Sequence, residues 1–170
     1  MMELTKENLV AYAAHYDSDA RVSDKTEEDA LKSILVVQRY LTKDQFVRVG
    51  IWKSPRQKKR YKSNDDVTVR EITAFSFSAK TEQARLGALL ALEGVSFPVA
   101  SVILHFAFPE RYPILDFRAL WSLGWELPKS YNFRFWAKYC DKIRSIAMES
   151  SLSIRTVDKA LWQYSKKNQK

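Results

Sequence analysis

Between Leu86 and Phe108 the sequence carries only one fully charged side chain, Glu93, together with His105. A segment this apolar has to be buried, either in a bilayer or inside a folded domain. A helix that spans a bilayer needs about 20 uninterrupted apolar residues, and here Glu93-Gly94 divides the segment and Pro98 follows. The segment therefore predicts two short buried helices joined by a tight turn, in a protein that we expect to be soluble and cytoplasmic.

The remaining composition favours an all-α fold. The 170 residues are 46% hydrophobic, which suffices for one packed domain, and four Gly and five Pro are too few for a turn-rich β structure. Apolar residues recur at helical spacing behind start signals such as Thr42, Asp65 and Ser153. We predict eight or nine helices in two small lobes around a cleft, with the N- and C-terminal helices in one lobe. A loop is expected over residues 17–25, before a helix that begins at Thr26.

Positive charge is concentrated in one segment. Of a net charge of +8, six Lys and Arg lie within ten residues that contain no acid: Lys53, Arg56, Lys58, Lys59, Arg60 and Lys62. This basic run favours a polyanion partner, because each cation that meets a phosphate releases counterions; a solvated loop is the alternative. Together with Pro55 it is expected to form a connector. A weaker cluster ends the chain: Lys159, Lys166, Lys167 and Lys170.

Cysteine and histidine are too rare for several kinds of site. The single cysteine, Cys140, excludes an internal disulfide, a Cys-rich zinc site and a cysteine-ligated iron–sulfur cluster. We expect it to be a buried small side chain. With only His15 and His105 in addition, no catalytic metal site is expected, and His105 is expected to lie in the core.

The most informative pattern has two parts. The first is a tight turn between two helices, carried by Leu92, Gly94, Val95 and Ala100. Gly94 permits a positive φ and keeps side chains away from a bound anion, while backbone N–H groups at the start of the second helix can hold a phosphate. The second part is Asp116, which follows Pro113 and lies sixteen residues after Ala100.

This pattern resembles the helix-hairpin-helix (HhH-GPD) DNA glycosylase superfamily of base-excision repair, over about Glu82 to Leu123. The resemblance implies a single domain over 1–170, with the hairpin at 82–107 and a catalytic loop and helix at 108–124. Asp116 matches the family's essential acid. Phosphate contacts are expected from the hairpin and the basic run: Gly94, Val95, Ser96, Lys53, Arg56, Lys58 and Lys59.

Two departures from the family pattern narrow the expected activity. Ser96 stands where many hairpins have a second glycine, which reshapes the phosphate site. Pro98 stands where bifunctional members carry the lysine that forms a Schiff base, so we predict an enzyme without lyase activity. No cofactor is expected; a monovalent cation at the hairpin carbonyls is left open, and the cysteine count excludes the iron–sulfur cluster of some members.

The chemistry follows from the bond that is broken. Cleaving an N-glycosidic bond puts positive charge on the sugar, which the Asp116 carboxylate would stabilise while it takes a proton from water. Asp116 is equally suited to cap a helix. The base must be flipped into a pocket, for which the candidate walls and wedge are Trp52, Tyr61, Trp121, Trp125 and Gln38.

The sequence thus predicts a monomeric hydrolase that binds double-stranded DNA, associates with no membrane, and excises a damaged or modified base. The role is DNA repair or defence against modified phage DNA, and the base is not identified. Two alternatives stay open. One is a helix-hairpin-helix module that binds DNA without catalysis, and the other is a helical interaction domain whose basic run meets an acidic protein.

Overall fold

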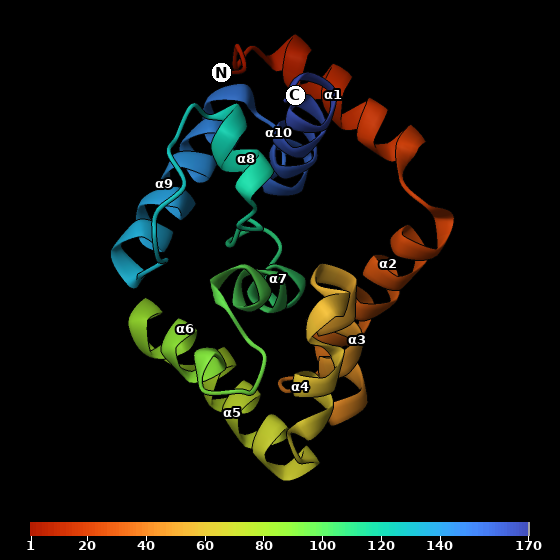
Figure 1. Ribbon diagram of the computed structural model, residues 1–170, viewed down its shortest axis with the longest axis vertical. Coiled ribbons are helices and arrows are strands. Elements are labelled where there is room, and N and C mark those ends of the chain that lie inside the picture. Colours follow the sequence, from red (N-terminus) through yellow and green to blue (C-terminus); the bar gives the residue numbers. More distant parts are fainter. Residues whose placement is uncertain (170) are drawn as a thin grey trace. The chain divides into compact units, whose positions relative to one another are not determined.

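The computed structural model describes residues 1–169, apart from the side chain of Val36. Within them the chain forms ten α-helices, one short 3-10 helix and no strand (Figure 1). The all-α class is confirmed, and the helix count is ten rather than eight or nine. None of the described helices is both long and apolar enough to cross a membrane. Lys170, the last residue of the C-terminal basic cluster, lies outside the described residues.

The chain divides into two compact units. The middle unit is Val22–Phe108, and the terminal unit joins Met1–Arg21 to the chain from Pro109 onward. The middle unit holds seven helical segments: α2 (Val22–Val37), α3 (Lys43–Lys53), the 3-10 helix η1 (Pro55–Gln57), α4 (Lys58–Ser63), α5 (Asp66–Ser78), α6 (Glu82–Leu90) and α7 (Phe97–Ala107).

Helix α7 forms the core of the middle unit. Every residue from Val99 to Phe106 is buried, His105 among them, and α2, α3 and α6 pack around the helix. The apolar segment from Leu86 to Phe108 therefore lies in two short helices, α6 and α7, joined by a tight turn, as predicted. The burial of His105 confirms that it lies in the core.

Local start signals in the middle unit are confirmed, and two other expectations are wrong. Thr42 caps α3 in a capping box with Gln45, and Asp65 caps α5. By contrast, α2 begins at Val22, so Thr26 lies inside it and its hydroxyl donates to the Val22 carbonyl (3.0 Å). The basic run expected as a connector is also helical, as η1 and α4, because Tyr61 gives α4 a side chain to bury.

The terminal unit contains α1 (Lys6–Asp19), α8 (Phe117–Ser122), α9 (Phe133–Ser150) and α10 (Ile154–Asn168). Helix α1 packs along α10, and side chains across the seam join Lys159 to Asp17 and Gln163 to Asp19, both at 2.7 Å. Cys140 is buried in α9 as predicted. The first and last helices of the sequence therefore share one core.

Candidate functional site

The turn between α6 and α7 is built on Gly94, whose φ is +87°. The predicted positive φ is confirmed, but the expected reason for the missing side chain is wrong. A Cβ on Gly94 would lie 2.8 Å from the ring of Tyr61, so the space that glycine leaves is filled by Tyr61 and is not open to an anion. Glycine is required here by both backbone conformation and close packing.

Tyr61, from α4, is completely buried. Its ring lies between two glycines, because a Cβ on Gly50 of α3 would also come within 2.7 Å of it, and its edge packs on Phe46 with 5.8 Å between centroids. Burial raises the pKa of its hydroxyl, which donates to the Ser54 carbonyl (3.3 Å). The expectation that Tyr61 stacks on a DNA base is therefore corrected: its ring holds the hairpin turn against α3 and α4.

Asn64 completes the link between α4 and the hairpin turn. Its amide accepts a hydrogen bond from the Glu93 N–H (2.9 Å) and donates one to the Glu93 carbonyl (3.1 Å), as a neighbouring backbone would. Arg60 adds an exposed ion pair to the Glu93 carboxylate (3.1 Å). These contacts place the basic run beside the hairpin, although the two are separated by about thirty residues in the sequence.

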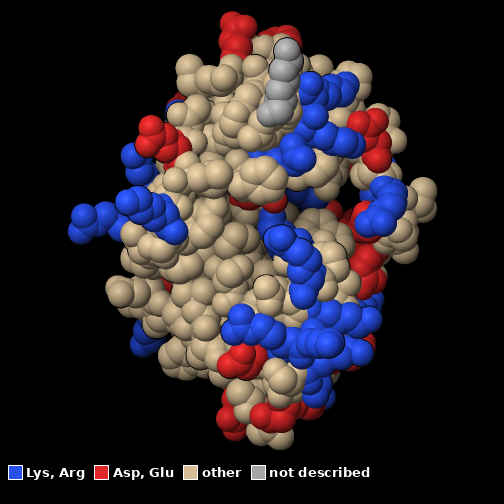
Figure 2. Space-filling model, viewed as in Figure 1, with Lys and Arg blue, Asp and Glu red and all other residues tan. Residues whose placement is uncertain are grey.

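The cations of the basic run point mainly into solvent. Arg56, Lys58 and Lys59 are exposed, and Lys53 is partly buried. Across residues 1–169, no acidic side chain pairs with Arg56, Lys58 or Lys59. Figure 2 shows Lys and Arg side chains gathered over the region where Figure 1 places α3 and α4. The hairpin turn is therefore flanked by unneutralised positive charge.

The three hairpin residues expected to hold a phosphate differ in their surroundings. Gly94 is buried, and the Val95 N–H already donates to the Leu92 carbonyl (3.1 Å), which corrects the expectation that it is free for a phosphate. Ser96 is exposed and precedes α7 without capping it through its side chain. Ser96 therefore lies exposed at the N-terminal end of α7, where the positive end of the helix dipole favours an anion.

Asp116 belongs to the terminal unit, where it caps α8. Its carboxylate accepts a hydrogen bond from the Arg118 N–H (2.9 Å). The charge of Asp116 acts on two tyrosine hydroxyls. Burial and then the charge of Asp116 raise the pKa of Tyr131, and burial followed by the charges of Asp158 and Asp116 holds the pKa of Tyr139 well above its usual value.

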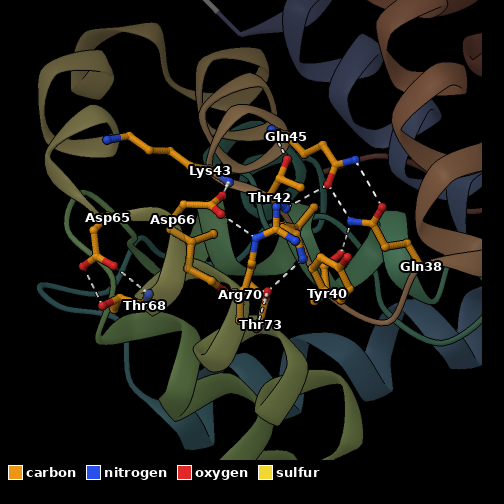
Figure 3. Close-up of polar contacts among 12 residues, drawn as sticks. Gln38, Tyr40, Thr42, Lys43, Gln45, Asp65, Asp66, Thr68, Arg70 and Thr73 are labelled. Carbon is orange, nitrogen blue, oxygen red and sulfur yellow. Dashed lines mark hydrogen bonds and ion pairs between the residues drawn. The ribbon is translucent and has the colours of Figure 1, made fainter.

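Two of the other residues expected at a base pocket are engaged within the middle unit. Gln38 donates to the Tyr40 carbonyl (2.6 Å) and to Gln45 (2.7 Å), so it closes the link between α2 and α3 and is not a free wedge (Figure 3). Trp52 donates to the Asp24 carbonyl (3.1 Å) and packs edge-on against Phe106. Both residues therefore stabilise the fold around α3.

The aromatic residues of the terminal unit are arranged differently. Trp121 is partly buried and lies against Tyr164, with 5.9 Å between centroids. Trp125 contacts Phe135 (5.8 Å) and Tyr139 (6.4 Å), so it belongs to a ring cluster that reaches the neighbourhood of Asp116. Sequence reasoning did not identify Tyr131 or Tyr139 as neighbours of Asp116, because no local pattern places either side chain beside it.

In the described part of the chain, no group of three or more His, Cys, Asp and Glu side chains is arranged to hold a metal ion. Comparison with known proteins adds no assignment, since no family model, curated protein or solved structure matches the chain.

Proposed function

We propose that this chain is a monofunctional DNA N-glycosylase, which removes a damaged or modified base and leaves an abasic site. The observation that carries the proposal is the attachment of the basic helix α4 to the Gly94 turn through Asn64 and Tyr61. The basic run and the hairpin turn, which are separate candidates for DNA binding in the sequence, therefore lie side by side. Asp116, at the expected distance along the chain, begins the next helix.

The binding step rests on phosphate recognition. The N-terminal end of α7 at Ser96 presents a positive dipole end, with Pro98 contributing no backbone donor there. The unpaired cations Arg56, Lys58 and Lys59 add charge that a polyanion would neutralise with release of counterions. Glu93, the one acid in the turn, is paired with Arg60, which lessens its repulsion of a phosphate. Contacts of this kind position a duplex without reading its sequence.

The chemical step is assigned to Asp116. As the glycosidic bond breaks, the sugar becomes cationic, and a carboxylate beneath it stabilises that charge and accepts the proton of the attacking water. A positioned general base supplies roughly 10²–10⁴-fold in rate. Capping α8 through the Arg118 N–H (2.9 Å) is compatible with this role, because a carboxylate offers about four acceptor sites.

We expect no strand cleavage at the abasic site because of Pro98. Strand cleavage by a Schiff-base route needs an amine nucleophile, and Pro98, in the first turn of α7, has none where related hairpins carry a lysine. We therefore assign simple hydrolysis, with an intact backbone at the abasic site.

The test is base release from a panel of labelled duplexes that contain deoxyuridine, deoxyinosine or methylated purines, together with modified phage DNA. We expect breaks that appear only after alkali treatment. Breaks without alkali would overturn the monofunctional assignment. DNA binding without any base release would favour a non-catalytic DNA-binding module. Absence of binding even at low ionic strength would favour an interaction domain for an acidic protein partner.

A further inference from the structure

The segment that leads into Asp116 is held by two buried side chains from other helices. Residues 112–115 are buried without regular secondary structure, so their backbone polar groups need partners from elsewhere in the protein. Ile114 has both of its groups paired. Its N–H donates to the Asp158 carboxylate of α10 (2.8 Å), and its carbonyl accepts from the Tyr139 hydroxyl of α9 (2.9 Å).

Both partners of Ile114 are polar side chains that lie in the protein interior. Asp158 is 4% exposed and Tyr139 is fully buried. A buried carboxylate is costly to desolvate, but a charged acceptor makes a shorter and stronger hydrogen bond than a neutral one. Burial, followed by the charges of Asp158 and Asp116, holds the pKa of Tyr139 well above its usual value. A tyrosine hydroxyl is protonated at neutral pH even at its ordinary pKa, so it can donate to Ile114.

We propose that Tyr139 and Asp158 are positioning residues for Asp116: they fix the backbone at Ile114, two residues before the reacting carboxylate. On the other side, Asp116 is fixed by its own cap on the Arg118 N–H (2.9 Å) and by the Leu120 N–H, which donates to its carbonyl (3.1 Å). The carboxylate is thus held from both directions along the chain. This inference rests on the proposed function.

Loss of either positioning residue should therefore slow base release without weakening DNA binding. A general base acts only within hydrogen-bond reach of its proton, and a displacement of about 1 Å can cost on the order of 10²-fold in rate. Neither Tyr139 nor Asp158 is exposed at the surface, so their loss leaves the contacts with DNA phosphates unchanged. A purely structural role would lower stability without separating rate from affinity.

The test uses four variants of the full chain. Tyr139→Phe removes one hydroxyl and keeps the ring, and Asp158→Ala removes the acceptor. Asp158→Asn keeps an oxygen that can accept from Ile114. The matched control is Ser122→Ala, which deletes another buried hydrogen bond to α10, from the Ser122 hydroxyl to the Leu161 carbonyl (2.6 Å). Ser122 follows Asp116 in the sequence and lies outside the segment that leads into it. Each is assayed by single-turnover base release on the duplex that the wild type processes, by anisotropy and by urea unfolding.

We expect Tyr139→Phe and Asp158→Ala to slow base release by about 10-fold to 100-fold with unchanged affinity for the duplex. Asp158→Asn should restore most of the rate, and Ser122→Ala should keep the wild-type rate despite a similar loss of stability. Wild-type rates in the first two, or an equal loss in Ser122→Ala, would overturn the inference. A wild type that releases no base from any duplex would instead reject the proposed function.

Discussion

Tyr61 is the residue on which the candidate phosphate site depends. Its ring occupies the space beside two glycines, Gly50 and Gly94, that are far apart in the sequence. Gly94 carries a second constraint, a φ of +87°, which side chains other than glycine adopt at a cost. The sequence predicts the backbone constraint, because a glycine between two helices is a local signal. It does not predict the packing constraint, because nothing in it pairs Gly94 with Tyr61.

These two constraints predict a large effect of Gly94→Ala. The left-handed conformation costs about 1–2 kcal/mol and overpacking about 1–3 kcal/mol, so the free energy of unfolding should fall by roughly 2–5 kcal/mol. Gly87 is the matched control, since a Cβ there meets nothing within 4 Å in the exposed part of α6. Gly87→Ala should raise stability by about 0.5–1 kcal/mol. Urea unfolding measures both, and a Gly94→Ala protein as stable as the wild type would contradict the packing argument.

Among the helices, α4 shows most clearly where sequence reasoning fails. The N-caps Thr42 and Asp65 were predictable because a cap depends on residues within one turn. A run of cations is as typical of a solvated loop as of a helix. What makes α4 a helix against the hairpin is the burial of Tyr61 and the double hydrogen bond from Asn64 to Glu93. Both contacts span about thirty residues of sequence.

The position of α4 predicts a specific salt dependence. If Lys58 and Lys59 each meet a phosphate, the variant Lys58→Gln/Lys59→Gln should weaken DNA binding and reduce the slope of log K against log salt by about 0.9 per contact. The control is Lys6→Gln/Lys142→Gln, which removes the same charge from exposed sites outside the basic run. Fluorescence anisotropy between low and moderate salt gives both slopes. Equal slopes in the two variants would show that α4 makes no phosphate contact.

The start of α5 carries a charge that links stability to pH. Hydrogen bonds from the Lys43 N–H (2.7 Å) and from Arg70 lower the pKa of Asp66 (Figure 3). A carboxyl whose pKa is lower in the folded state stabilises the fold above its unfolded pKa, and the contribution is lost as pH falls through the folded pKa. Asp66→Asn should therefore be less stable than the wild type at neutral pH.

The same linkage predicts that the difference between Asp66→Asn and the wild type shrinks as pH falls below the usual carboxyl range and disappears once Asp66 is protonated. Urea unfolding at a series of pH values measures it. Asp141→Asn is the control, since Asp141 is largely exposed and its ion pair with Arg144 is long (3.3 Å). A stability difference for Asp66→Asn that stays constant over the acid range would refute the role of its charge.

Across the whole molecule, the order of the motifs along the chain is predictable from the sequence, whereas the contacts between residues far apart in the sequence are not. The spacing from Gly94 to Asp116 follows from the sequence alone, and the structure places Gly94 in the turn between α6 and α7 and Asp116 at the N-cap of α8. The hydrogen bond from Ile114 to Asp158 spans 44 residues. It depends on how α10 packs in the terminal unit, which no local pattern specifies. Residues that orient a site are therefore harder to foresee than residues that act in it.

The central claim is that Asp116 performs the chemistry, and Asp116→Asn tests it most directly. Asparagine caps helices as well as aspartate does, so the fold and the affinity for DNA should be unchanged. Single-turnover base release should fall by about 10²-fold or more, while Asp141→Asn, which removes the same charge from α9, keeps the wild-type rate. Base release by Asp116→Asn at the wild-type rate would contradict the account.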